Sequence, residues 1–200
     1  MQAELAPVER RLAGHRYLDE LEARRVPPES LRAFAGEQRS IIASDRTSFE
    51  HLARRFPQAP AGGVFRDMAA GESEALRLLE RFAAAVGLGD EYEPLPGCQA
   101  YPAHVAWLAL NGSPADVALA FLANLASWGS SCVRMRDALR PVYGADPVAF
   151  FDFFSEPPAD FEERALELVA RGEPASARRA ARLLQAYELL YWDTLADGLH

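Results

Sequence analysis

The sequence contains no lysine, although it has 21 basic residues, all of them arginine. A chain without lysine cannot form a Schiff base on its own side chain, attach pyridoxal phosphate or supply the lysine of a phosphate-binding P-loop. Alanine is also abundant, and we attribute the exclusive use of arginine to the base composition of the genome. The absence of lysine therefore excludes several chemistries and does not itself indicate a function.

Cysteine, positive charge and long apolar runs are also scarce. Cys98 and Cys132 are too few for a disulfide scaffold or a four-cysteine zinc site, and they favour a reducing cytoplasm. No apolar stretch approaches the ~20 residues that span a bilayer, and residues 1–11 lack the apolar segment of a secretory signal. The net charge is −8, whereas nucleic-acid-binding proteins carry a basic surface. We therefore expect a cytoplasmic protein with no membrane or nucleic-acid partner.

The histidines and cysteines show no spacing typical of a metal site. The four histidines lie far apart, and the sequence has no Glu-x-x-His pair of the kind that a carboxylate-bridged di-iron bundle uses. Cys132 has Arg134 and Arg136 nearby, and such charges can lower a thiol pKa, but a buried and inert cysteine is the more ordinary interpretation. We predict neither a metal nor a cofactor.

Apolar residues recur at helical spacing along most of the chain, and the alternation typical of strands is almost absent. Proline and glycine mark the expected helix ends, and Ser113-Pro114-Ala115-Asp116 is a strong helix start. We expect a break at Gly62-Gly63 and a loop over Gly89–Gly97. The pattern predicts an all-α single-domain bundle over residues 1–200. About seven helices are expected, at roughly Ala3–Ala23, Pro28–Arg55, Asp67–Val86, Tyr101–Leu110, Ala115–Leu139, Asp160–Arg171 and Pro174–Asp197, with a short segment at Asp146–Phe154.

Polar side chains interrupt the apolar helical pattern at four places. Glu188 lies one turn before Tyr191 and Trp192, and a carboxylate among aromatic rings can have a raised pKa and act as a general acid or base. A solvent-facing glutamate is the alternative. Asn124 follows a very apolar run and needs hydrogen-bond partners, either in the core or at an internal cavity. The other two places, which are more often structural when taken alone, are Tyr101 with His104 and Gln38 with Arg39.

In their order along the chain, these features resemble the TenA/THI-4 and PqqC family, which has the heme-oxygenase-like fold. The last helix carries the most specific similarity, because Tyr187-Glu188-Leu-Leu-Tyr191-Trp192-Asp-Thr-Leu-Ala196 resembles the family's Glu-x-x-Phe-Trp-x-x-Ala. Weaker similarities lie at His15-Arg-Tyr-Leu with Val26-Pro27-Pro28-Glu29-Ser30-Leu31, at Phe34-Ala-Gly-Glu-Gln38-Arg39, at Gly71-Glu-Ser-Glu74 through Val86-Gly87-Leu88, at Tyr101-Pro-Ala-His104, and from Trp128 to Arg134.

The resemblance implies a helical bundle around a central pocket for a small molecule. TenA members hydrolyse thiamin or its aminopyrimidine breakdown products with a cysteine nucleophile, an aspartate, a tyrosine and a glutamate. Tyr101 and Glu188 match the last two and are expected to be catalytic. The nucleophile position falls on Asn124, and the aspartate position falls on Arg39. The expected ligand-binding residues are Gln38, Arg39, His104, Asn124, Tyr191 and Trp192.

Two classes of function fit this resemblance. The first is a cofactor-independent hydrolase of an aminopyrimidine or another small heterocycle, in which Glu188 is the acid or base and Tyr101 orients the substrate or donates a proton. The second is a non-catalytic ligand-binding or regulatory protein that keeps the pocket without the nucleophile. An arginine in the pocket would favour an anionic ligand, as in a PqqC-like enzyme acting on an anionic heterocycle. The resemblance also implies a homodimer or homotetramer, with heme binding through His15 as a further alternative.

Overall fold

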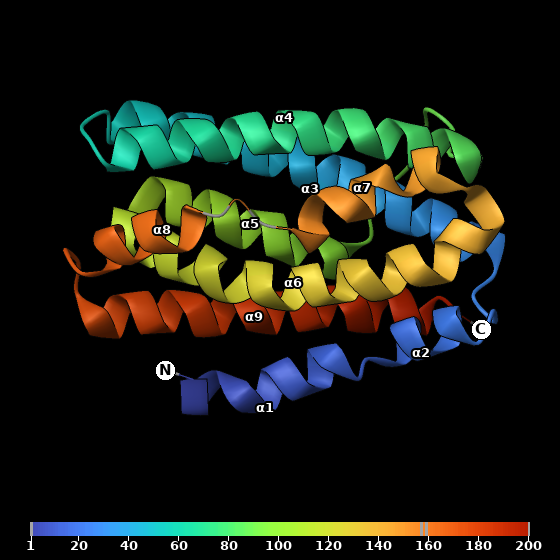
Figure 1. The fold of residues 1–200 in the computed structure, drawn as a ribbon. Helices are drawn as coiled ribbons and strands as arrows, with labels where there is room; N and C mark the ends of the chain where they lie inside the picture. Colours follow the sequence, from blue (N-terminus) through green and yellow to red (C-terminus); the bar gives the residue numbers. More distant parts are fainter. Residues whose placement is uncertain (1, 157, 159, 200) are drawn as a thin grey trace.

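The computed structural model of the protein describes residues 2–156, 158 and 160–199, and within them the chain forms nine α-helices and no strand. The all-α fold expected from the sequence is confirmed. Figure 1 shows the long helices stacked side by side, with the pair α3 and α4 on one side and α1 and α2 along the opposite side, next to α9. The helices are α1 Gln2–Ala13, α2 Arg16–Glu22, α3 Pro28–Arg55, α4 Ala61–Ala85, α5 Pro96–Asn111, α6 Pro114–Tyr143, α7 Ala145–Ser155, α8 Phe161–Val169 and α9 Pro174–Asp197.

Local sequence signals set the starts of α6 and α9. Ser113 precedes α6, and its hydroxyl accepts a hydrogen bond from the Asp116 backbone N–H at 3.3 Å. The Asp116 carboxylate in turn accepts from the Ser113 backbone N–H at 2.7 Å, which completes a capping box. Before α9, the Glu173 carboxylate accepts hydrogen bonds from the backbone N–H groups of Ala175 and Ser176. These contacts satisfy N–H groups that have no partner within the helix.

The N-terminal segment differs from its prediction of one helix over Ala3–Ala23. The chain instead forms α1 and α2, which are separated at Gly14 and His15. The backbone of His15 is extended, with φ −74° and ψ 135°, and its Nδ1 accepts a hydrogen bond from the Tyr17 backbone N–H at 3.2 Å. The imidazole thus caps α2. This division and the short α7 account for nine helices where about seven were expected.

A second difference lies at Gly62-Gly63, where a break was expected. The helix α4 begins at Ala61 and runs through both glycines. A side chain on Gly62 would collide with the backbone carbonyl of Pro57, so glycine permits a close approach of two backbone segments here. The helix α5 also begins earlier than expected, because Pro96 is a suitable first residue and not the end of a loop.

An aromatic cluster at the centre of the bundle joins five helices. Phe34 on α3 is fully buried, and its ring centroid lies 5.8 Å from that of Phe151 and 6.3 Å from that of Trp128. Phe82 and Trp192 are each at 6.2 Å. Aromatic pairs at such spacings contribute about 0.5–1.5 kcal/mol each beyond the burial of their surface. The cluster fixes α3, α4, α6, α7 and α9 relative to one another, and these helices surround the site.

No apolar stretch long enough to span a bilayer was expected from the sequence. The helix α6 differs from this expectation, because by length and composition it could cross a membrane. Its most apolar window of 18 residues has a mean hydropathy of 1.2. In the structure 61% of that window is buried within the bundle, where α6 packs mainly against α7 and α9. The apolar character of α6 is therefore explained by its position in the core.

Candidate functional site

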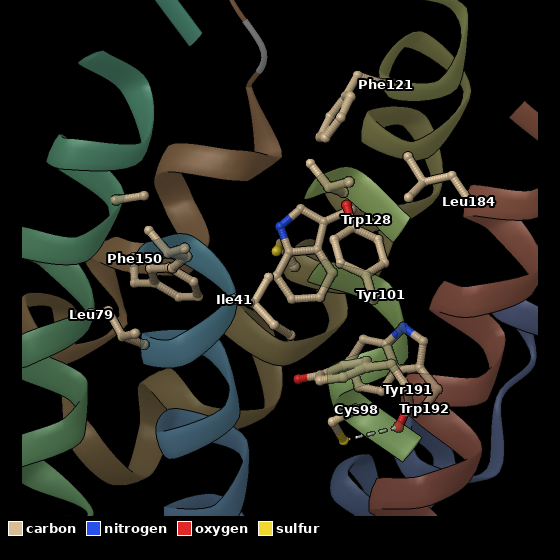
Figure 2. Packing of buried hydrophobic residues seen from close by; sticks show 14 of the residues in the cluster. Ile41, Leu79, Cys98, Tyr101, Phe121, Trp128, Phe150, Leu184, Tyr191 and Trp192 are labelled. Carbon is tan, nitrogen blue, oxygen red and sulfur yellow. Dashed lines mark hydrogen bonds between the residues drawn. The ribbon is translucent and has the colours of Figure 1, made fainter. Parts of the chain in front are cut away.

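A cavity of about 50 Å³ lies in the middle of the bundle, and we call it the inner cavity. Figure 2 shows the rings of Tyr101 and Trp128 in this region, between α3 and α9. Because one water needs ~10–15 Å³ of such space, the cavity holds a few waters or a small part of a ligand. It is lined by Gln38, Ile41, Ile42, Asp45, Glu72, Tyr101, Phe121, Asn124, Leu125, Trp128, Phe154, Glu188 and Tyr191.

A chain of hydrogen bonds runs through one wall of the inner cavity. Tyr101 on α5 donates its hydroxyl proton to Oδ1 of Asn124 at 3.0 Å. Nδ2 of Asn124 on α6 donates to Oε2 of Glu188 on α9. Nε1 of Trp192 donates to Oε1 of the same carboxylate at 3.4 Å. The structure thus brings together both expected catalytic residues and uses Asn124 as the link between them.

Burial raises the pKa values of the two titratable side chains in this wall, Glu188 and Tyr101. It raises the pKa of Glu188 to about 8, and the hydrogen bond from Trp192 acts in the opposite direction with less effect. Burial also raises the pKa of Tyr101 well above its ordinary value, and the nearby carboxyl groups raise it further. Glu188 can therefore take up or release a proton near neutral pH, while Tyr101 keeps its proton and acts as a donor.

Two more carboxyl groups line the inner cavity, and sequence reasoning missed both. Asp45 on α3 is only 3% exposed, and its Oδ1 has no hydrogen-bond partner among the described residues. Burial raises the pKa of Asp45 well above its ordinary value, and the charge of Glu72 raises it further. Burial raises the pKa of Glu72, on α4, to about 8. The unpartnered oxygen of Asp45 indicates a position for a ligand or water.

A sequence signal existed for one of these two residues. Asp45 lies seven residues after Gln38, which places both on the same face of α3 with Ile41 and Ile42. Glu72 lies in the polar run Gly71-Glu-Ser-Glu74, which reads as a solvated helix face. Only the packing of α4 against α3 shows that Glu72 faces inward.

The carboxylic acids of the inner cavity have no basic residue beside them in its lining. Asp45, Glu72 and Glu188 line it, and its lining contains neither arginine nor histidine. Aromatic rings of Tyr101 and Trp128 complete the wall, and such rings attract cations through their faces. This combination is complementary to an organic cation or a protonated amino heterocycle.

Two other expected ligand-binding residues also line the inner cavity. Nε2 of Gln38 donates a hydrogen bond to the hydroxyl of Tyr191 at 2.9 Å, and both side chains are buried. Trp192 lies behind Glu188 and contacts the carboxylate, although the tryptophan is not part of the cavity lining. Its role in the structure is to hold Glu188 in place.

The structure places Arg39 and His104 away from the inner cavity, in contrast to the expectation. The guanidinium of Arg39 binds both carboxylate oxygens of Glu80, at 2.9 and 2.8 Å, on the outside of the α3–α4 pair. His104 is stacked on Trp107, with centroids 6.0 Å apart, and lines a separate groove with Tyr187. Arg39 follows Gln38 by one residue, and successive helix positions point about 100° apart. One of the two side chains therefore faces outward.

No cysteine lines the inner cavity within the described part of the chain. Cys132 is 1% exposed, and burial raises the pKa of its thiol well above the ordinary value, with a further effect of Glu188. The thiol of Cys98 donates to the backbone carbonyl of Tyr191 at 3.9 Å (Figure 2). Both thiols therefore act as core groups.

The structure describes no metal-ligating cluster in residues 2–156, 158 and 160–199, since no three His, Cys, Asp or Glu side chains there are placed to hold an ion. His15, the residue considered for heme, has protein partners on both ring nitrogens. Nδ1 accepts from the Tyr17 backbone, and Nε2 lies 3.0 Å from Oδ1 of Asp193. In this arrangement the imidazole is a structural cap that ties α2 to α9.

The fold and the site define a helical bundle with a cavity lined by carboxylic acids at its centre. The sequence matches the model of the TENA/THI-4/PQQC family over residues 2–197, and the chain belongs to this family. No curated protein matches the sequence closely.

Solved structures show the same fold at low sequence identity. A TenA homologue from Pseudomonas syringae pv. tomato has a TM-score of 0.81 and 13% identity, with 98% of this chain and 90% of that chain covered. A TenA homologue from Pyrococcus furiosus has a TM-score of 0.76 and 16% identity, with 97% of both chains covered. A domain from Shewanella denitrificans, described as having a heme oxygenase-like fold, has a TM-score of 0.76 and 13% identity, with 98% and 89% covered. The heme-oxygenase-like fold expected from the sequence is confirmed.

Proposed function

We propose that the protein is a cofactor-independent hydrolase that cleaves a C–N bond in an aminopyrimidine or a related cationic heterocycle. The observation that carries this proposal is the environment of Glu188. Its carboxyl group is buried, lines the inner cavity, receives hydrogen bonds from Asn124 and Trp192, and has a pKa of about 8. A general acid or base works best when its pKa is close to the working pH.

In the proposed reaction, Glu188 handles the proton and water supplies the nucleophile. The ionised carboxylate takes a proton from water while the water oxygen forms a bond to the substrate carbon. The C–N bond then breaks with its electron pair on nitrogen, and Glu188 returns the proton to the leaving amine. The net change is replacement of an amino group by a hydroxyl group with release of the amine, without oxidation or reduction. Tyr101 donates a hydrogen bond to Asn124, and Asn124 donates one to the carboxylate of Glu188 and holds it in place.

The charge of the inner cavity supports an amino-substituted substrate. Asp45 and Glu72 can accept hydrogen bonds from amino groups and stabilise a protonated ring. Arg39 is the residue that would favour an anionic ligand, and its side chain is paired with Glu80 outside the cavity. A PqqC-like reaction on an anionic heterocycle therefore has less support than an amine-releasing hydrolysis.

A non-catalytic ligand-binding or regulatory protein is the second candidate, and one observation favours it. Asn124 stands where the resemblance places a nucleophile, and neither cysteine reaches the inner cavity. A protein that has lost the nucleophile but retains the cavity could still bind the ligand of its relatives. Under this alternative the substitution Glu188→Gln changes affinity and has no reaction to abolish.

Turnover of aminopyrimidines separates the two candidates. The purified protein is incubated with 4-amino-5-aminomethyl-2-methylpyrimidine, and product is followed by mass spectrometry together with released ammonia. We expect turnover by the unmodified protein and a loss of at least about 100-fold in Glu188→Gln. Glu167→Gln is the matched control, because Glu167 is exposed on α8 and pairs with Arg171. No turnover by the unmodified protein, or equal turnover in Glu188→Gln, contradicts the hydrolase.

We also propose a homodimer or homotetramer. Trp107 and Leu110 on α5 are 55% and 63% exposed, and neighbouring exposed apolar side chains are typical of a contact surface. Light scattering after size-exclusion chromatography measures the mass, and a monomer at micromolar concentration contradicts the proposal.

A further inference from the structure

A second hollow adjoins the inner cavity and opens between α4, α6, α7 and α8; we call it the outer cleft. Its volume is about 240 Å³, against about 50 Å³ for the inner cavity. The two share part of their walls, and the shared residues are Glu72, Phe121, Leu125 and Phe154. The outer cleft therefore lies directly against the candidate site, with these side chains between the two.

The outer cleft differs from the inner cavity in chemistry. Its walls are mainly apolar, with Met68, Phe153 and Phe161 each partly exposed to it. Apolar side chains left accessible in a concave surface are typical of a ligand site. They can bury an apolar group of a ligand, which contributes about 25 cal/mol for each Å² removed from water.

Acidic side chains stand at the rim of the outer cleft. They are Asp67, Glu156 and Asp160, and the lining contains one basic residue, Arg164. The guanidinium of Arg164 is bound to Asp67 at 2.6 Å and to Asp160 at 3.2 Å. The charge around the entrance therefore attracts cations and repels anions.

The inner cavity alone is too small for a whole heterocycle with its substituents. It has space for a few waters, and its one buried and unpartnered oxygen belongs to Asp45. An amino group fits this space and supplies the missing hydrogen bond. The remainder of such a molecule must pass Leu125 and Phe154 and lie in the outer cleft.

We propose that the natural ligand is an elongated organic cation, with its amino or ammonium group among Asp45, Glu72 and Glu188 and an apolar or aromatic extension in the outer cleft. This proposal rests on the proposed function, because the same inner cavity binds the reacting end. Glu72 lies at the junction and contacts both parts. Met68, Phe153 and Phe161 set the preference for the extension and take no part in the reaction.

A series of primary amines measures the two parts separately. Ethylamine, butylamine, hexylamine and octylamine are charged at pH 7 and differ only in the apolar chain. We expect ethylamine to bind through the inner cavity and each added methylene to raise the affinity about fourfold until the outer cleft is filled. The corresponding alcohols lack the charge and should bind much more weakly. Calorimetry or thermal shift at constant ionic strength gives the dissociation constants.

One variant closes the outer cleft without touching the inner cavity. Gly71 on α4 lines the cleft, and an added side chain there meets no atom within 4 Å at its first carbon. The substitution Gly71→Phe therefore fills the cleft and leaves the helix intact, since glycine is a poor helix former. Ala70→Phe is the matched control, because Ala70 is the preceding residue on α4, is exposed and is not part of the cleft lining.

The outcomes decide between the two proposals. A gain with chain length that disappears in Gly71→Phe and persists in Ala70→Phe supports the extension site. Binding of ethylamine without any gain for longer amines, or with the same gain in Gly71→Phe, overturns the extension site and leaves the inner site standing. Failure of every amine to bind overturns the extension site, and the turnover assay with the aminopyrimidine decides the proposed function separately.

Discussion

Asn124 donates a hydrogen bond from its side-chain amide to Oε2 of Glu188, across the interface of α6 and α9 and next to the inner cavity. The amide fits between these helices, and because it carries no charge it can be buried there. It favours the ionised form of the carboxylate, which burial alone disfavours.

The substitution Asn124→Leu tests this link, because leucine has a similar branched shape and removes the donor. We expect the pKa of Glu188 to rise above about 8 and the pH midpoint of activity to rise with it. The free energy of unfolding should fall by about 1–3 kcal/mol, since the buried Oε2 of Glu188 loses its donor and the hydroxyl of Tyr101 loses its acceptor. Carboxyl-carbon NMR gives the titration independently of activity. An unchanged titration of Glu188 contradicts the link.

The stability of the protein should decrease as pH rises from about 4.5 to 8. Burial raises the pKa of Glu188 from 4.5 to about 8, so the folded protein binds a proton in this range that the unfolded chain has released. The stabilisation from this proton is fully present below pH 4.5, the pKa in the unfolded chain, and is lost above about pH 8, the pKa in the folded protein. Between these values one such group changes the free energy of unfolding by about 1.4 kcal/mol per pH unit. Asp45 and Glu72 contribute with the same sign.

Urea unfolding at pH 5, 6, 7 and 8 measures this slope. Glu188→Gln should show a smaller slope than the unmodified protein and should be at least as stable at pH 8, because its amide carries no charge to bury. Equal slopes in the two proteins would show that Glu188 titrates normally in the folded state.

Asp45→Asn separates charge from shape at the unpartnered carboxyl group. The amide has the same size, so the bundle should fold with equal or greater stability once the buried carboxyl group is removed. We expect the affinity for ethylamine to fall between about 10- and 100-fold, the range for a hydrogen bond to a charged group. An affinity within twofold of the unmodified protein contradicts a role of Asp45 in ligand binding.

Arg39→Ala should leave ligand binding unchanged within twofold. The guanidinium pairs with Glu80 outside the α3–α4 helix pair, and the side chains of Arg39 and Glu80 are 31% and 50% exposed. Exposed ion pairs contribute about 0–1 kcal/mol, so the unfolding midpoint should move little. A tenfold loss of affinity for any amine would place Arg39 in the ligand site and contradict its observed position.

The sequence predicted the all-α fold because periodicity and caps are local properties. The predicted helix ends were wrong at two short-range backbone contacts: Gly62 permits a close approach to the backbone of Pro57, and His15 caps a helix that begins in the middle of an apolar pattern. Neither contact can be read from spacing alone.

In the site, Glu188 and Tyr101 were predicted from the order of motifs, and Asn124 from its place in an apolar helix. Asp45 and Glu72 were missed because an acidic residue on a long helix is usually solvated. The apolar face that Asp45 shares with Ile41 and Ile42 was a local signal for its direction, whereas the inward direction of Glu72 depends on the packing of α4 against α3.

The central claim is that the inner cavity binds a cation through Glu188, whose raised pKa of about 8 leaves it largely protonated at neutral pH, together with Asp45 and Glu72. Proton release on binding tests it most directly. The protein is titrated with butylammonium chloride at pH 7 in a pH-stat, with sodium chloride and butanol as controls. The account predicts release of about one proton for each ammonium ion bound, decreasing in Glu188→Gln and in Asp45→Asn. Saturable binding without proton release would contradict it. Proton release as large in both variants as in the unmodified protein would also contradict it.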